Sequence, residues 1–189
     1  MKSIVLVVSL VFCMAFCAAL SFAQAQSTPS TTPATTKDPV ATSLRGMLPR
    51  SQSNTVGALE AMPADKYSYK PTPDQMSFAH LAAHIAEANN FFCAKVADVP
   101  APKVDEVKDT ETKDQLVAAV KASYAFCNEA LGKMDDSKLG DTVELFGGRK
   151  LPRAAAALSL AGGWADHYAA AAMYLRLNGI LPPSAQPKK

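Results

Sequence analysis

Four segments of this chain repeat apolar residues at steps of three and four positions, and strand-like alternation is nearly absent. This spacing places apolar side chains on one face of an α-helix. The predicted helices cover residues 39–62, 77–97, 112–131 and 152–178. Helices of roughly 20 residues with one apolar face typically pack against each other. The sequence therefore predicts an all-α fold, a four-helix bundle.

Capping and helix-breaking residues mark the helix boundaries. Pro49 lies inside the first segment and is expected to kink or interrupt it, because proline lacks a backbone N–H. The second helix starts at Ser77 if that hydroxyl is the N-cap, or at Thr72 if a capping box forms there instead. A second capping box, beginning at Thr112, opens the third helix. We interpret residues 133–151 as a polar loop.

Two cysteines constrain how the second and third helices run. Cys93 lies 16 residues after Ser77, and Cys127 lies 15 residues after Thr112. If the helices are parallel, the sulfurs lie about 1.5 Å apart along the axis, which allows a disulfide. If they are antiparallel, the offset is about 16 Å, too far for the bond. Two unpaired buried cysteines, packed as small apolar side chains, are the alternative.

The connection between these helices favours the parallel arrangement. Residues 98–111 are 14 residues long, enough to extend over roughly 45 Å. An antiparallel neighbour needs only about two to eight residues. We therefore predict a long crossover between the second and third helices, and a Cys93–Cys127 disulfide worth a few kcal/mol.

Residues 1–25 have the pattern of a secretory signal peptide. Lys2 supplies the positive charge, residues 4–20 are apolar and uncharged, and residues 23–25 (Ala-Gln-Ala) offer the small side chains that precede a cleavage site. A retained membrane anchor is the alternative, because 17 apolar residues are near the lower limit for crossing a bilayer. We expect cleavage, no stable membrane anchor afterwards, and a periplasmic or secreted protein, where a disulfide persists.

Composition divides the rest of the chain. Residues 26–38 form a flexible Ser/Thr/Pro-rich linker, residues 39–184 the helical domain, and residues 185–189 a tail. Of the 19 basic side chains, 18 remain once Lys2 is removed, against 17 acidic ones, which leaves a formal charge of +1. Because nucleic-acid binding needs clustered basic residues, we expect no nucleic-acid partner.

The chain has three histidines, and their positions suggest a metal site. His80 and His84 lie one turn apart on the second helix, and His167 lies on the fourth. Helical bundles build metal sites from side chains on facing helices, and imidazole is a common ligand. His167 lies about 60° from the apolar stripe centred on Trp164, whereas Asp166 lies about 160° away and should face solvent. Without a metal, these histidines are solvated or hydrogen-bonded side chains.

Two neighbouring features bear on this site. Each glycine of Gly162-Gly163 costs about 1 kcal/mol in mid-helix relative to alanine, so the pair indicates a close helix contact, a widened pocket or the loss of a ligand. Five aromatic side chains either line an apolar pocket or belong to the ordinary core: Phe91, Phe92, Trp164, Tyr168 and Tyr174.

Several motifs together resemble the DinB-like superfamily over residues 40–184. They are residues 62–73 (MPADKYSYKPTP), Ser77-Phe78 before His84-Ile85-Ala86, and His167-Tyr168 followed by Tyr174-Leu175-Arg176, Gly179 and Pro182-Pro183. The resemblance implies an up-down-down-up four-helix bundle, which agrees with the parallel helices inferred from the cysteines.

The resemblance also implies a divalent-metal site with one histidine on the second helix and an H-x-x-x-H pair on the fourth. His84 matches the first position and His167 the last, but the middle position is Gly163. His80 is the candidate third ligand, since histidines at i and i+4 form a good chelate. With His84 and His167 as main ligands and His80 or water beside them, we expect zinc or nickel binding to be weak or absent.

Two classes of function follow. The resemblance implies a hydrolase- or transferase-type, metal-dependent fold, although the sequence identifies no catalytic residue. The alternative is a non-catalytic envelope protein, a helical bundle that binds a small apolar molecule or acts as a scaffold. In either case the small-molecule partner is unknown. The resemblance also allows a homodimer, because family members often pair through helix faces.

Overall fold

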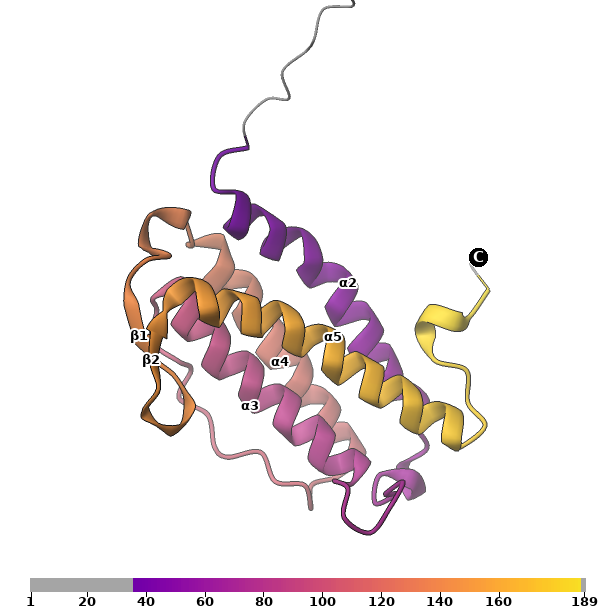
Figure 1. Ribbon diagram of the computed structural model, residues 1–189. Helices are drawn as coiled ribbons and strands as arrows, with labels where there is room; N and C mark the ends of the chain where they lie inside the picture. Colours follow the sequence, from indigo (N-terminus) through magenta and orange to yellow (C-terminus); the bar gives the residue numbers. More distant parts are fainter. Residues whose placement is uncertain (1–35, 188–189) are drawn as a thin grey trace, which may run out of the picture. The chain divides into compact units, whose positions relative to one another are not determined.

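The computed structural model describes residues 36–187, so the predicted signal peptide and most of the predicted linker lie outside the described residues. Four helices dominate it, and Figure 1 shows them packed lengthwise: α2 (Pro39–Ala61), α3 (Phe78–Ala97), α4 (Lys113–Gly132) and α5 (Arg153–Leu177). The predicted all-α four-helix bundle is confirmed. None of the helices between residues 36 and 187 is long and apolar enough to cross a membrane.

Contacts between helix ends show that α2 and α4 are antiparallel. Arg45, near the start of α2, donates to the carbonyl oxygen of Leu131 at the end of α4, at 3.0 Å. Lys113, the first residue of α4, donates to the carbonyl oxygen of Met62 just after α2, at 2.8 Å. These cations also satisfy carbonyl groups that a helix end leaves without intrahelical partners.

Similar contacts show the directions of α3 and α5. The Arg153 guanidinium, at the start of α5, donates to the carbonyl oxygen of Lys95 in the last turn of α3, so these two helices are antiparallel. Lys138, which follows α4, forms an ion pair at 2.7 Å with Asp98, which follows α3. The ends of α3 and α4 therefore lie together, and the order is up-down-down-up.

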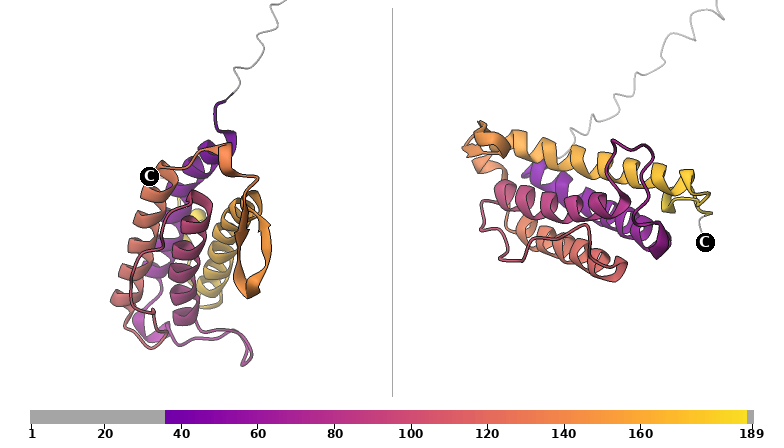
Figure 2. Two further views of the ribbon diagram at one scale, coloured as in Figure 1. Left: turned by 90° about the vertical axis from the view of Figure 1, so that its left-hand side faces the viewer. Right: turned by 90° about the horizontal axis from the view of Figure 1, so that it is seen from below.

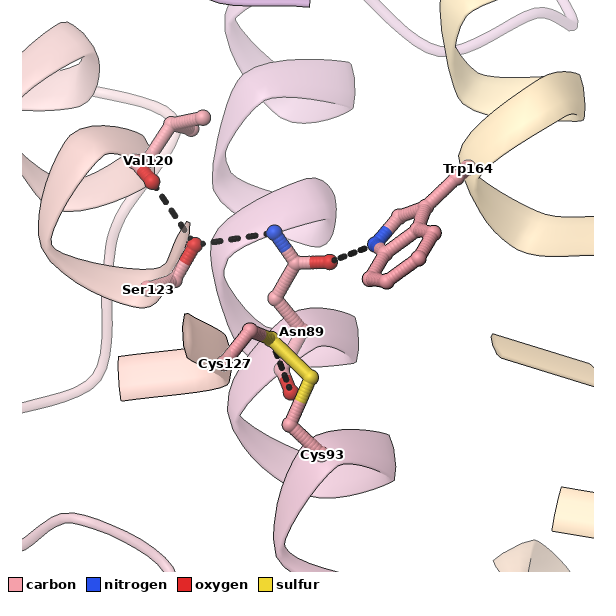
Figure 3. Close-up of a disulfide and its surroundings, with 6 residues drawn as sticks. All are labelled: Asn89, Cys93, Val120, Ser123, Cys127 and Trp164. Atoms are coloured by element: carbon pink, nitrogen blue, oxygen red, sulfur yellow. Dashed lines mark hydrogen bonds between the residues drawn. A yellow bond between two sulfur atoms is a disulfide. The ribbon is translucent and has the colours of Figure 1, made fainter. Parts of the chain in front are cut away.

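The predicted crossover and disulfide are both present. The chain between α3 and α4 runs back along the bundle (Figures 1 and 2), as a parallel pair of helices requires. Cys93 and Cys127 form a disulfide with a Cα–Cα distance of 5.2 Å (Figure 3). Matching heights on parallel helices therefore bring the two sulfurs together, as the residue count from each N-cap predicts.

A buried polar network crosses the core beside the disulfide (Figure 3). The Asn89 amide on α3 accepts a hydrogen bond from the Trp164 indole on α5 and donates one to the Ser123 hydroxyl on α4, each at 3.0 Å. On α4 the Tyr124 hydroxyl donates to Thr55 of α2 at 3.2 Å. All five side chains are almost fully buried, so these bonds join the four helices where an unpaired polar group would be costly.

The helix starts follow the predicted capping residues. Ser77 rather than Thr72 caps α3, because its hydroxyl accepts from the backbone N–H of His80 at 3.0 Å. Thr112 and Gln115 form the predicted capping box at the start of α4. At the start of α2 the cap comes from a distant residue: the Asp136 carboxylate accepts from the N–H groups of Val40 and Ala41, both at 2.8 Å.

Two local features differ from expectation: α2 is not interrupted, and the polar loop holds a hairpin. Pro49 lies inside α2, which continues through it without interruption. Its ring is exposed while Leu44 and Leu48 are buried, so the lost backbone hydrogen bond faces solvent and core packing holds both halves of the helix. The expected polar loop contains an antiparallel hairpin, β1 (Thr142–Glu144) with β2 (Lys150–Pro152).

Asn89 should contribute more to stability than its neighbour Asn90. Asn89→Ala leaves the buried Trp164 N–H without an acceptor, whereas the Ser123 hydroxyl keeps its hydrogen bond to the Val120 carbonyl oxygen. We therefore expect a loss of about 1–3 kcal/mol in the free energy of unfolding. The matched control is Asn90→Ala, because the Asn90 Oδ1 has no hydrogen-bond partner among residues 36–187. Urea unfolding followed by fluorescence of Trp164, the only tryptophan, measures both variants. Equal losses would contradict the role assigned to the network.

Candidate metal centre

The structure brings two of the three histidines together. His84 on α3 and His167 on α5 have ring centroids 5.0 Å apart, with the ring planes almost perpendicular at 85°. The antiparallel packing of α3 and α5 creates this approach across the seam between them. Two imidazoles at this separation, from facing helices, can both be ligands of one ion.

His167 is the more buried of the pair. Its Nδ1 atom is buried and has no hydrogen-bond partner within the described part of the chain. Burial, and then the nearby charge of His84, lower the pKa of His167 to about 4, against a weak opposing effect of Asp166. The ring is therefore neutral near pH 7 and keeps a lone pair, which is the form that binds a metal. An unpaired buried nitrogen of this kind is consistent with a ligand-binding position.

His80 faces the crossover rather than the space between His84 and His167. Its Nδ1 lies 3.3 Å from the Asp109 carboxylate of the crossover, and both side chains are about half exposed. His80 lines a separate open cavity of about 300 Å³, with Glu106 and Asp109 on the crossover side. His84 borders this cavity as well, so it lies between His80 and His167.

Gly163 lies one turn before His167 and leaves room beside it. A Cβ atom built on Gly163 would lie 3.6 Å from the Cε1 atom of His167, an ordinary van der Waals contact. A Cβ on Gly162 would meet no described atom within 4 Å. The glycine pair therefore does not serve a close helix contact, and a widened pocket fits Gly163.

Asp166 is exposed, as its position on the helical wheel predicts.

A small cavity of about 70 Å³ lies between the two histidines and the core. Its floor is the hydrogen-bonded pair of Asn89 and Trp164. Ser159 and Gly163 also line it, together with aliphatic and aromatic side chains: Ala88, Phe92, Phe146 and Leu160. The cavity therefore combines an apolar wall with two imidazoles.

Of the five aromatic residues considered as pocket or core, two line the cavity. Phe92 and Trp164 line the cavity, whereas the Tyr168 hydroxyl donates to Ser184 at 2.6 Å and the Tyr174 hydroxyl donates to the carbonyl oxygen of Met76 at 2.7 Å. Phe91 lies behind the lining and stacks on Phe146 with ring centroids 4.0 Å apart.

Phe146 is the lining residue that sequence analysis missed. It lies in the turn of the β1–β2 hairpin, directly before Gly147 and Gly148, which both have positive φ angles, 69° and 71°. The available signal was a Gly-Gly pair between short alternating stretches, with Val143 paired with Leu151 across the hairpin. That pattern indicates a hairpin, and the hairpin places the Phe146 ring over the cavity.

Comparisons with known proteins now assign the family. The sequence profile of the DinB superfamily matches residues 47–171. This chain belongs to the DinB superfamily. None of the curated proteins matches it.

Solved structures agree with this DinB-superfamily fold. A DinB-like protein from Bacillus subtilis is 22% identical, with a TM-score of 0.62 over 77% of this chain and 99% of that one. A DinB-like protein from Bacillus cereus is 17% identical, with a TM-score of 0.61 over 74% and 93% of the two chains. A conserved protein from Enterococcus faecalis is 20% identical, with a TM-score of 0.58 over 76% and 98%. At these identities the likeness supports the fold alone.

The donor set of this DinB-superfamily chain is smaller than a typical metal site. Between residues 36 and 187 no group of three or more histidine, cysteine or acidic side chains is arranged to hold an ion. His84 and His167 offer two imidazoles, so an ion there would complete its shell with water. The residues therefore fit a weakly held divalent ion with open coordination positions.

The buried His167 should make stability depend on pH. Its pKa is about 4 in the folded chain, against 6.5 for an ordinary histidine. Between these values the unfolded chain binds more protons, so stability falls as the pH falls, by about 1–3 kcal/mol in all. Urea unfolding with a chelator present should show this loss between pH 6.5 and pH 4, and His167→Gln should remove most of it.

A second variant separates the two causes of this shift. His84→Gln removes the neighbouring charge that opposes protonation, so the pKa of His167, measured by NMR, should rise in this variant while burial still keeps it low. A His167 ring that titrates at the ordinary histidine pKa in the unaltered protein would contradict its burial.

Proposed function

We propose that this chain is an exported DinB-superfamily protein that binds a divalent transition-metal ion weakly through the imidazoles of His84 and His167. The observation that carries the proposal is the approach of these two rings to 5.0 Å from facing helices. Zinc and nickel are the candidates, because both accept imidazole ligands. The site is of the hydrolase or transferase type, in which a bound ion activates a water molecule.

The residues around the two histidines support such a site in distinct ways. Burial keeps His167 neutral near pH 7, so no proton competes with an ion for its lone pair. The Asn89–Trp164 hydrogen bond holds the floor of the cavity. Phe92 and Phe146 form an apolar side of it, while His84 is exposed and leaves the other side open to solvent.

Export is supported by two independent features of the chain. Residues 1–25 carry the charge, the apolar stretch and the small residues of a signal peptide. The Cys93–Cys127 disulfide suits an oxidising compartment such as the periplasm or the extracellular space. We therefore expect the mature protein in one of these compartments.

A second candidate function rests on the walls of the same cavity. Phe92, Leu160 and Trp164 form an apolar surface beside the histidines, and one missing ligand position weakens metal binding. A non-catalytic envelope protein that holds a small apolar molecule there would use this surface. The two candidates differ in whether a metal ion or an apolar molecule binds next to Trp164, which makes the indole a useful reporter.

Replacing Gly163 with histidine should restore tight metal binding. In the untagged protein, Ni²⁺ or Zn²⁺ should bind weakly, and Gly163→His should tighten binding about tenfold or more because it adds a third imidazole one turn from His167. The matched control is Gly162→His, whose imidazole would project from an exposed position. Isothermal titration calorimetry measures the affinities, and Ni²⁺ quenching of Trp164 fluorescence reports binding next to the indole.

Several outcomes of this titration would overturn the assignment. Tight one-to-one binding that survives loss of both His84 and His167 would place the ion elsewhere. Equal gains from Gly162→His and Gly163→His, or no gain from either, would contradict the proposed site. No binding in the unaltered protein, together with Trp164 quenching by small apolar molecules, would favour the second candidate function.

Export makes a prediction about the mature protein. The intact mass of protein recovered from the periplasm or medium should correspond to a chain that starts at Gln26, after the Ala-Gln-Ala stretch. It should contain no thiol that reacts with a labelling reagent under denaturing conditions, because Cys93 and Cys127 are joined. A full-length chain in the cytoplasmic fraction with both thiols free would contradict export.

A further inference from the structure

A further cavity, partly open to solvent, lies beneath the crossover. It has a volume of about 310 Å³, at the lower end of the range for small-molecule pockets. Its walls come from α3, from α4 and from crossover residues 102–111, and none of the described residues that line it belongs to α5. It shares Glu106 and Val107 with the open cavity beside His80 and His84, but no histidine lines it.

Small side chains create this space. Ala86 on α3 and Ala119 and Ala122 on α4 face the underside of the crossover, and Phe126 adds an aromatic wall. The crossover is anchored on both sides of the space. Val99 bonds back to the end of α3 at 3.1 Å, and Asp109 contacts His80 at 3.3 Å. The chain thus bridges a gap that its own side chains do not fill.

The charges around this cavity are of one sign. Asp105, Glu106 and Glu111 line it, and no lysine, arginine or histidine is among the described lining residues. None of the three acidic side chains takes part in an ion pair within residues 36–187. Lys103 and Lys108 are near in sequence but lie outside the lining, and both are exposed. An apolar interior with an acidic rim favours a ligand with an apolar body and a positive head.

Asn90 adds a hydrogen-bond acceptor at the same place. It lines the cavity, and its Oδ1 atom is buried without a donor among the described residues. The torsion of an asparagine amide is soft, so a modest rotation would turn this oxygen toward a bound molecule. An unused acceptor favours a ligand that carries N–H donors over one that carries only acceptors.

We propose that this cavity binds a small cationic amphiphile of the primary alkylammonium class. The alkyl chain packs against Ala119, Ala122 and Phe126, and the ammonium group lies at the carboxylates of Asp105, Glu106 and Glu111. The inference uses none of the histidines, so it stands or fails independently of the metal proposal.

Calorimetric titration of the mature protein with n-octylammonium chloride and with sodium octanoate tests the proposal. The two probes share a chain length and differ in head-group charge. Octylammonium should bind with one-to-one stoichiometry, and octanoate about tenfold or more weakly, because the acidic rim attracts one head group and repels the other. Added salt should weaken octylammonium binding.

Two sets of variants locate the binding. Ala119→Phe fills the cavity from α4 and should abolish octylammonium binding, whereas Ala118→Phe, its exposed neighbour, should leave binding unchanged. The triple variant Asp105→Asn, Glu106→Gln and Glu111→Gln removes the three charges, and the amide oxygen at position 111 can still accept from the Lys108 backbone N–H. This variant should lose the preference for octylammonium over octanoate. Circular dichroism and urea midpoints verify that each variant is folded.

The proposal is overturned by any of three results. The first is no saturable octylammonium binding at millimolar concentration, and the second is equal affinity for both probes. The third is binding that Ala119→Phe leaves intact in a folded protein, which would place the probe elsewhere, including the cavity beside Trp164.

Discussion

The hydrogen bonds of the Asn89 side chain are the interaction on which the rest of this structure depends. One amide joins α3 to the Trp164 indole of α5 and to Ser123 of α4, inside a core where an unpaired partner would be costly. The disulfide lies one turn further along both α3 and α4. His84 precedes Asn89 by about one turn, and His167 follows Trp164 by about one turn. The bond between Asn89 and Trp164 therefore also sets the approach of the two histidines.

Because this core network holds the four helices together, the bundle can keep unfilled cavities near its surface. Contacts between distant segments close the helix ends, with Arg45, Lys113 and Arg153 on carbonyl groups and Asp136 on N–H groups. These charged side chains replace partners that helix ends lack, and they hold each helix against another. With centre and ends held, small residues such as Ala119 and Gly163 can remain beneath the crossover and beside His167 without loss of the fold.

Helix positions and directions could be predicted because they follow from short-range rules. Caps at Ser77 and Thr112 set the starts of α3 and α4. Multiplying the rise per residue by the distance in sequence from each cap then gives the heights of Cys93 and Cys127 along their helices. The features that were missed depend on contacts between distant segments. Pro49 stays within α2 because core packing outweighs its local cost, and His80 contacts Asp109 because of the path of the crossover, which helical periodicity does not encode. Phe146 covers the cavity only because a three-residue strand pairs with β2.

The candidate centre places two physical requirements in opposition. Burial lowers the pKa of His167 because a positive charge is poorly solvated there, and the same lack of solvation opposes a divalent cation. Metal sites usually offset this with a third donor or a carboxylate, but Gly163 supplies no side chain and Asp166 faces solvent. Metal affinity at this centre therefore depends on how well the cavity stabilises a positive charge. A polar side chain at position 163 would help to stabilise the charge of a bound ion. The glycine instead leaves a neutral, partly apolar space that also suits an uncharged molecule.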